Sequence, residues 1–169
     1  GEFGLDLVGE FSYYADKEEE LQGAAAHLVA QGAVKAALGV DLNGAPRRAA
    51  ALSGVDFLKP TYGTVSRYGV ISCAASGEQI GVYAENVESV GEIMGVIAGH
   101  DEKDGTSLRE ESYNYRTDLA VEGKKACIVK ELFDRADEQV QKRVEAYAQK
   151  LRKNGVAVEE VSCDFFDIA

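Results

Sequence analysis

The sequence contains few of the residues that build metal, disulfide or histidine-based sites. Its 169 residues include two histidines and three cysteines. An odd number of cysteines cannot all pair, and Cys73, Cys127 and Cys163 lack the spacing of metal ligands. The glycines around residue 44 match neither a phosphate-binding loop nor a dinucleotide fingerprint. We therefore expect reduced core thiols in a cytoplasmic protein, with no metal and no cofactor.

Long hydrophobic runs and an excess of positive charge are also missing. No run of 18 apolar residues occurs, so we expect no membrane-spanning helix. The acidic stretch GEFGLDLVGEF at the N-terminus lacks the basic and apolar regions of a signal peptide. The chain carries 29 acidic and 18 basic residues, a formal net charge of −11. A phosphate backbone would be repelled on average, so direct binding of nucleic acid is not expected.

Apolar stretches that alternate with helical periodicity predict the α/β class, with a mixed or largely parallel sheet and flanking helices. The length suggests one domain over residues 1–169. Between 61 and 77 the chain has no regular period, which indicates a long loop of the kind that often carries function. Strands are expected over 34–41, 54–60, 78–84, 124–132 and 156–163, and helices over 21–31, 46–52, 87–98 and 137–153.

The stretch GVDLNGAPRRAA, residues 39–50, predicts a strand that turns sharply into a helix. Gly44 permits the tight turn, and Pro46 suits the first turn of a helix. Such a turn presents one side chain at its tip and directs backbone N–H groups from the helix N-terminus. Here that side chain is the methyl group of Ala45. His27 and His100 are expected to be surface or capping residues.

Three further runs carry a family resemblance: LKPTYGTVSRYGV (58–70), EQIG (78–81) and IAGHDEKDGTS (97–107). They resemble the amidase signature family, and within it the A subunit of the glutamyl-tRNA(Gln)/aspartyl-tRNA(Asn) amidotransferase. The resemblance extends from about residue 19 to the C-terminus, whereas 1–18 match weakly. It implies a truncated amidase-signature core, and the family activity would be that of an amidase or glutaminase.

The resemblance also assigns positions to the family's catalytic residues. The family's nucleophile turn falls on residues 41–50, with the nucleophilic serine at Ala45, and its cis-serine falls on Leu21. The family's lysine lies in an upstream segment that has no counterpart here. We therefore expect no catalytic residue and a protein that is not an enzyme. The residues expected to line a vestigial binding site are Asn43, Gly44, Arg47, Tyr62, Arg67, Tyr68 and Gln79.

These expectations favour a non-catalytic remnant that acts through protein–protein contact. Two alternatives stay open, namely a component of a split glutamyl-tRNA amidotransferase or amidase, and a binding module for a small amide or amino acid. We expect a homodimer formed through a sheet edge or through an aromatic patch at Phe165, Phe166 and Ile168. A protein similar to the B subunit of the amidotransferase is the other candidate partner.

Overall fold

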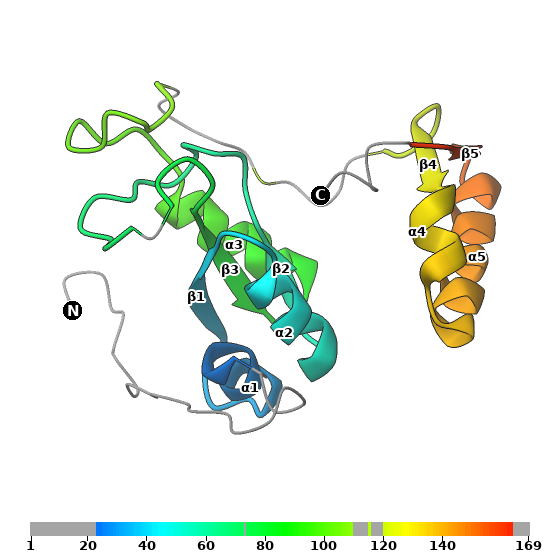
Figure 1. Ribbon diagram of the computed structural model, residues 1–169, viewed down its shortest axis with the longest axis horizontal. Helices are drawn as coiled ribbons and strands as arrows, with labels where there is room; N and C mark the ends of the chain where they lie inside the picture. Colours follow the sequence, from blue (N-terminus) through cyan, green and yellow to red (C-terminus); the bar gives the residue numbers. More distant parts are fainter. Residues whose placement is uncertain (1–22, 73, 110–114, 116–119, 164–169) are drawn as a thin grey trace. The chain divides into compact units, whose positions relative to one another are not determined.

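The computed structural model describes residues 23–72, 74–109, 115 and 120–163. The chain divides into two compact units, Gly1–Thr117 (unit 1) and Asp118–Ala169 (unit 2). Both contain helices and strands (Figure 1), so the α/β class is confirmed. The single domain expected over residues 1–169 stays a prediction.

Unit 1 is built on a three-stranded antiparallel sheet with the strand order β1-β3-β2. The strands are β1 (Ala36–Asp41), β2 (Asp56–Leu58) and β3 (Gln79–Ala84). The central strand has the sequence QIGVYA, and five of its six residues are buried. Both outer strands are edges of this sheet as described.

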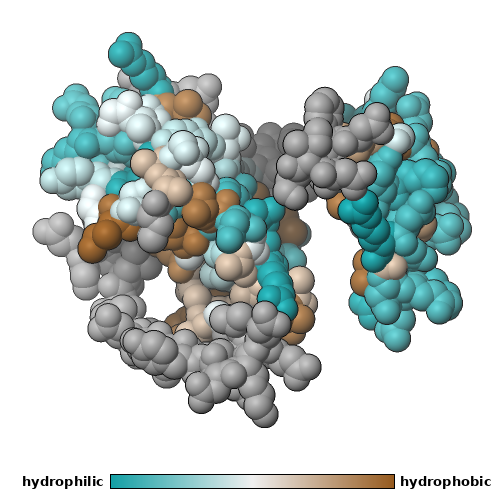
Figure 2. All heavy atoms as spheres, viewed as in Figure 1, coloured by the Kyte–Doolittle hydropathy of each residue, from teal (hydrophilic) through white to brown (hydrophobic). Residues whose placement is uncertain are grey.

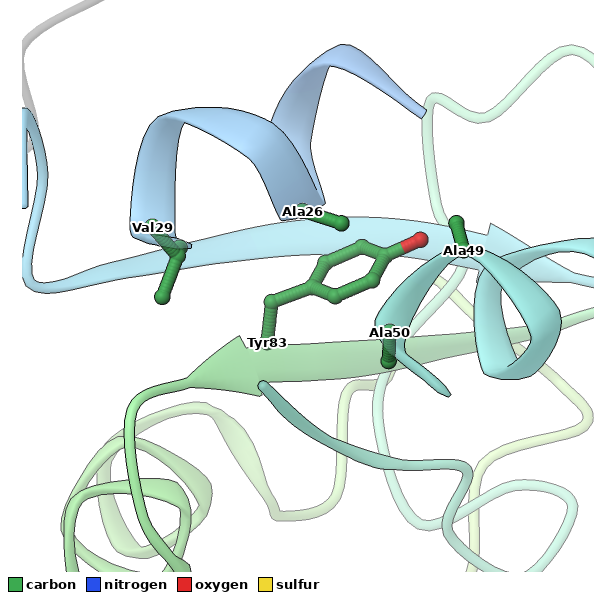
Figure 3. Close-up of a cluster of buried hydrophobic side chains, with 5 residues drawn as sticks. All are labelled: Ala26, Val29, Ala49, Ala50 and Tyr83. Atoms are coloured by element: carbon green, nitrogen blue, oxygen red, sulfur yellow. The ribbon is translucent and has the colours of Figure 1, made fainter. Parts of the chain in front are cut away.

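Two short helices, α1 (Ala24–Ala30) and α2 (Ala45–Ser53), cover one face of this sheet. The ring of Tyr83 points from β3 between these helices (Figure 3) and packs with four small side chains: Ala26, Val29, Ala49 and Ala50. Small residues suit this position because a large ring fills the space between two closely packed helices.

The opposite face is covered by α3 (Val87–Ile97). Successive side chains of a strand point to opposite faces, so Val82 and Ala84 lie on this side and pack with Val90 and Met94. The helix begins as predicted, because Asn86 Oδ1 accepts a hydrogen bond from the Ser89 N–H at 2.9 Å. Val65 of the long loop belongs to the same cluster.

Unit 2 contains β4 (Lys125–Val129), α4 (Lys130–Arg135), α5 (Glu138–Lys153) and β5 (Ala157–Val161), with β4 parallel to β5. The strand expected over 124–132 is therefore too long, since α4 begins at Lys130. Lysine, glutamate and leucine are good helix formers, and Lys130 forms an i,i+4 ion pair with Asp134 at 2.6 Å.

One expectation about burial in unit 2 is wrong, because Cys127 is exposed rather than in the core. The apolar side chains along one face of α5 are also largely open, with Val140 49% and Tyr147 60% exposed. Ala148 is the buried residue of this helix. A two-stranded sheet is narrow and covers only part of a four-turn helix. None of the helices in the described part of the chain is long and apolar enough to cross a membrane.

Candidate functional site

The turn between β1 and α2 has the geometry that its sequence predicts. The chain leaves β1 at Asp41, and Gly44 caps α2 with φ at 103°. This left-handed conformation strongly favours glycine. Pro46 lies in the first turn of the helix. The turn therefore places the backbone of Gly44 and Ala45 at the N-terminal end of α2.

Asp41 holds this turn together. Its fully buried carboxylate accepts hydrogen bonds from the Gly44 N–H at 3.0 Å, from Arg47 Nε at 2.9 Å and from Lys59 Nζ at 3.0 Å. Burial by itself would raise the pKa of Asp41, but the hydrogen bonds from Arg47 and Lys59 outweigh it and lower the pKa to about 2. The carboxylate is thus ionised at neutral pH and fully partnered.

Lys59 connects the turn to β2. Its ammonium group also donates a hydrogen bond to the Leu42 carbonyl at 3.0 Å. Lys59 follows β2, which lies on the far side of β3 from β1. Three parts of unit 1 therefore meet at Asp41: the end of β1, the start of α2 and the segment after β2.

The structure places Ala45 as the first residue of α2, with an exposed side chain. A methyl group can neither attack a carbonyl nor transfer a proton. Gly44 and Arg47 lie at the Asp41 turn, as expected, and Asn43 is an exposed residue of the same turn. Leu21 lies outside the described residues. The assignment of Ala45 and Leu21 to the family's catalytic positions stays a prediction.

Arg67 organises the long loop that follows β2. Its guanidinium donates hydrogen bonds to the Ala75 carbonyl at 2.5 Å, to the Tyr62 hydroxyl and to Thr106 Oγ1 at 3.0 Å. It also stacks over the Tyr62 ring, 4.5 Å from the centroid. One planar fork thus ties together three separate points of the chain.

Two buried residues fix the end of the loop. The Gln79 side chain accepts a hydrogen bond from the Gly63 N–H at 3.0 Å and donates one to the Val65 carbonyl at 3.3 Å. The carboxylate of Glu78 accepts hydrogen bonds from Ser72 Oγ at 2.6 Å and from the Ala74 N–H at 3.0 Å. Both polar atoms of the Gln79 side chain therefore hold the loop, and its expected place in a binding site stays a prediction.

The GHDEKDGTS run packs against the same loop. Asp104 accepts hydrogen bonds from the Arg67 N–H at 2.8 Å and from Thr106 Oγ1 at 2.6 Å. The hydrogen bonds from Thr106 and Arg67 lower the pKa of Asp104. Asp101 accepts a hydrogen bond from Ser66 Oγ at 2.6 Å. The two most distinctive runs of the sequence thus form one hydrogen-bonded assembly.

A cavity of about 230 Å³ opens between these two runs. Tyr68, Ser72 and Glu78 line it from the loop, and Lys103 and Asp104 line it from the second run. Of the expected binding residues, Arg67 and Tyr68 line this cavity, while Tyr62 contacts Arg67. The expected residues therefore fall into two groups, one at the Asp41 turn and one at the loop.

Two further hydroxyl groups, those of Ser107 and the buried Tyr83, belong to residue types that can take part in catalysis. Ser107 Oγ lies 3.0 Å from His100 Nδ1. However, Ser107 is buried, and its Oγ accepts a hydrogen bond from the Asp101 N–H and lies 2.9 Å from the Asp101 carbonyl. Burial raises the pKa of Tyr83 to about 12, with a further contribution from the charge of Asp41. The Ser107 hydroxyl therefore ties together the backbone of the GHDEKDGTS run, and the Tyr83 phenol is neutral at pH 7.

Sequence reasoning missed several residues of these networks. Lys59, Glu78, Lys103 and Asp104 all lie within or beside the runs LKPTYG, EQIG and GHDEKDGTS, so the motifs pointed to them without giving their roles. In the described part of the chain, no group of three or more His, Cys, Asp or Glu residues could hold a metal ion.

Comparison with known proteins identifies the family. The family model described as "Amidase" matches residues 23–168, and the chain belongs to this family. It is 39% identical to the A subunit of glutamyl-tRNA(Gln) amidotransferase from Lactobacillus delbrueckii subsp. bulgaricus, over 95% of this chain and 36% of that protein. The corresponding protein of Halobacterium salinarum is 38% identical, over 97% of this chain and 42% of that protein.

A solved structure supports the same conclusion. The crystal structure of the glutamyl-tRNA(Gln) amidotransferase A subunit from Thermotoga maritima matches with a TM-score of 0.78 and 35% identity, covering 85% of this chain and 32% of that one. The resemblance inferred from the motifs is thereby confirmed. The chain spans well under half the length of the relatives it matches.

One expectation is corrected by these matches. We expected a protein that is not an enzyme because Ala45 and Leu21 occupy the family's serine positions. The chain belongs to a family of enzymes. The relatives to which it is about 40% identical are by name subunits of an amidotransferase. Two residue assignments and an unmatched lysine segment were too narrow a basis for excluding the whole class.

Proposed function

We propose that this chain is the segment of an amidase-family enzyme that frames the amide-binding site, as a component related to the A subunit of glutamyl-tRNA(Gln) amidotransferase. The buried, ionised Asp41 carries the proposal. It fixes the turn into α2 through Gly44, Arg47 and Lys59, and free backbone N–H groups at the N-terminus of a helix can stabilise a developing negative charge.

In this proposal position 45 is where a reacting hydroxyl would lie, and the base that activates it comes from polypeptide other than residues 23–163. The methyl group of Ala45 offers no nucleophile, and Ser107 is buried in a saturated network. The relatives are more than twice as long as the matched segment. Further polypeptide of the same enzyme, or a second protein chain, would complete the site.

The surface of unit 1 supports completion through protein contact. On β1, an edge strand, Leu38 is 45% and Val40 46% exposed. Figure 2 shows brown, hydrophobic areas exposed on unit 1, whereas the described surface of unit 2 is mostly teal in this view. Open strand edges and exposed apolar side chains are typical of surfaces that bind further polypeptide.

Two partners fit this surface. A second copy of the chain would pair β1 with β1 about a two-fold axis, giving the homodimer expected from the sequence. A protein similar to the amidotransferase B subunit is the alternative, because the relatives are by name one subunit of an amidotransferase. Cytoplasmic localisation and the lack of direct nucleic-acid binding remain predictions from the composition.

A chimera tests the framing role. Residues 23–163 would replace the matching segment of the Thermotoga maritima protein, which then supplies the rest of the enzyme. With the additional Ala45→Ser substitution, we expect ammonia release from glutamine. The matched chimera that keeps alanine at position 45 should release at least a hundredfold less, because it lacks the nucleophile.

Further variants separate the role of the Asp41 turn in shaping the site from the role of the reacting hydroxyl. Adding Asp41→Asn to the active chimera should lower its rate by at least tenfold while circular dichroism shows a folded protein. A folded Ala45→Ser chimera without activity would overturn the proposal. Glutamine hydrolysis by the unmodified 169-residue chain, above a buffer control, would place the reacting group elsewhere and also overturn it.

A further inference from the structure

The cavity between the long loop and the GHDEKDGTS run has the features of a small-ligand site. Its volume is about 230 Å³, which is below the range of pockets for drug-sized ligands and suits a small metabolite. All of its lining residues lie between 67 and 105, and none belongs to the Asp41 turn. It is therefore a site separate from the one framed by α2.

The lining carries balanced charge. Two carboxylates, Glu78 and Asp104, are 4% and 9% exposed and belong to the loop networks described above. Two cations, Arg67 and Lys103, complete the charged lining. A polyanion would be repelled by the carboxylates and a metal ion by the cations. The charge pattern favours a ligand that carries one group of each sign.

Lys103 is the more exposed of the two cations that line the cavity. The Nη atoms of Arg67 donate hydrogen bonds to the Ala75 carbonyl in the loop and to Thr106 in the second run, and its buried Nε has no hydrogen-bond partner among the described residues. The Lys103 ammonium lies over the Tyr68 ring, 5.3 Å from the centroid, and has no hydrogen bond or ion pair with a described residue. Tyr68 is 64% exposed. An exposed ammonium group that lies over a tyrosine ring in the lining of a cavity can bind a carboxylate.

The neighbouring wall can accept hydrogen bonds from an ammonium group. Asp104 Oδ2 accepts one described hydrogen bond, from the Arg67 N–H at 2.8 Å, and a carboxylate oxygen can accept two. Gly105 leaves open space beside it, because an added Cβ would have no atom within 4 Å. Asp104 and Gly105 both line the cavity, and Asp104 Oδ2 has capacity for one further hydrogen bond from a ligand ammonium group.

We propose that this cavity binds a small free α-amino acid, with its carboxylate at Lys103 and Tyr68 and its ammonium group at Asp104. This binding site does not depend on the framing role proposed above. It gives a location to the alternative, left open by the sequence, that the chain binds an amino acid.

Nuclear magnetic resonance titration of the ¹⁵N-labelled 169-residue chain tests the proposal. L-glutamine and L-alanine are the zwitterionic probes. Propionate and ethylamine are matched controls, because each keeps a similar carbon skeleton and one of the two charges. We expect saturable shifts of the Tyr68, Lys103 and Gly105 amides with the amino acids, and at least tenfold weaker binding of both controls.

Variants establish which side chains bind the ligand. Lys103→Met keeps much of the aliphatic stem and should weaken binding at least tenfold. Tyr68→Phe removes only the hydroxyl and should weaken it several-fold. Glu102→Gln changes an adjacent exposed residue that does not line the cavity, and should leave binding unchanged. All three positions are exposed, so the variants should fold.

Three results would overturn the proposal. One is the absence of shifts at residues 67–72 and 103–105 with either amino acid. Another is equal binding of propionate and alanine, which would show a simple anion site. The third is unchanged affinity in Lys103→Met. Shifts confined to residues 43–47 would instead place the ligand at the Asp41 turn, so failure here is distinguishable from failure of the chimera.

Discussion

Asp41 and Gln79 lie directly opposite each other in the β1–β3 register, and each holds a different loop. Both side chains are almost fully buried, at 0% and 1% exposed. Asp41 binds the Gly44 N–H of the turn into α2, and Gln79 binds the Gly63 N–H of the long loop. One pair of facing residues in the antiparallel β1–β3 pairing therefore positions both the turn into α2 and the long loop.

The first prediction concerns Asp41→Asn. The substitution leaves the charges of Arg47 and Lys59 uncompensated, so we expect the free energy of unfolding to fall by about 2 to 3 kcal/mol at pH 7. Urea denaturation monitored by circular dichroism measures it. Asp56→Asn, at an exposed residue of β2, should change the stability by less than about 0.5 kcal/mol.

The stabilities of the wild type and of Asp41→Asn should depend differently on pH. The pKa of Asp41 is lowered from 3.8 to about 2, so the native state binds this proton more weakly than the unfolded chain does. The resulting stabilisation, about 2 kcal/mol, is present above pH 4 and is lost as the pH falls toward 2. The gap between wild type and Asp41→Asn should close over that interval. Parallel stability curves from pH 4 to pH 2 would contradict the role of Asp41.

Gly44→Ala tests the strain in the turn. At a φ of 103° an alanine is in a region that L-residues rarely adopt, and its Cβ would lie 3.3 Å from Arg47 Nη2. We expect a loss of about 1 to 3 kcal/mol in unfolding free energy. Gly95→Ala, inside α3 with open space around it, should instead stabilise the chain by about 0.5 to 1 kcal/mol. Equal effects at both positions would refute the assigned turn geometry.

Arg67→Lys tests the organisation of the long loop. A lysine cannot reproduce a planar fork that reaches Ala75, Tyr62 and Thr106 together. Hydrogen exchange of the Thr64 and Val70 amides should become at least tenfold faster, and stability should fall by about 1 to 3 kcal/mol. Arg48→Lys, on the exposed surface of α2, is the matched control and should change neither quantity. Unaltered exchange at both amides in Arg67→Lys would show that other contacts hold the loop.

The predicted homodimer is tested by light scattering coupled to size exclusion at micromolar concentration. We expect a mass of twice 18.1 kDa. Leu38→Glu places a charge on the exposed face of the edge strand and should shift the protein to monomer. Leu132→Glu, on an exposed position of α4, is the control. A monomeric wild type would exclude the homodimer and leave the protein similar to the amidotransferase B subunit as the candidate partner.

Local patterns in the sequence predicted most elements of unit 1. The turn at residues 42–44 and the start of the helix at 87 depend on interactions between residues a few positions apart, and the apolar composition of 78–84 indicated a buried strand. The networks around Arg67 and Glu78 could not be predicted in this way. Their partners come from distant segments, as when Arg67 reaches Thr106, and such pairing depends on the fold as a whole.

The errors in unit 2 have a different cause. The helical period over 137–153 correctly predicted a helix, but periodicity indicates which side chains share a face and not what covers that face. The sheet of unit 2 has two strands, and α5 buries Ala148 instead. Similarly, the resemblance assigned the family's nucleophile position to Ala45, an assignment that stays a prediction, but could not decide whether the protein takes part in catalysis.

The packing of Tyr83 between α1 and α2 limits which substitutions the neighbouring positions can accept. A Cβ added at Gly39 would lie 2.7 Å from the Tyr83 ring, so alanine fits at position 39 only where the side chain at 83 is smaller or turned away. A smaller side chain at 83 would in turn empty the space between Ala26, Ala49 and Ala50 and favour larger residues there. Positions 39 and 83 should therefore covary among close relatives. Where the side chain at 83 is smaller, the alanines of the two helices should be replaced by larger residues.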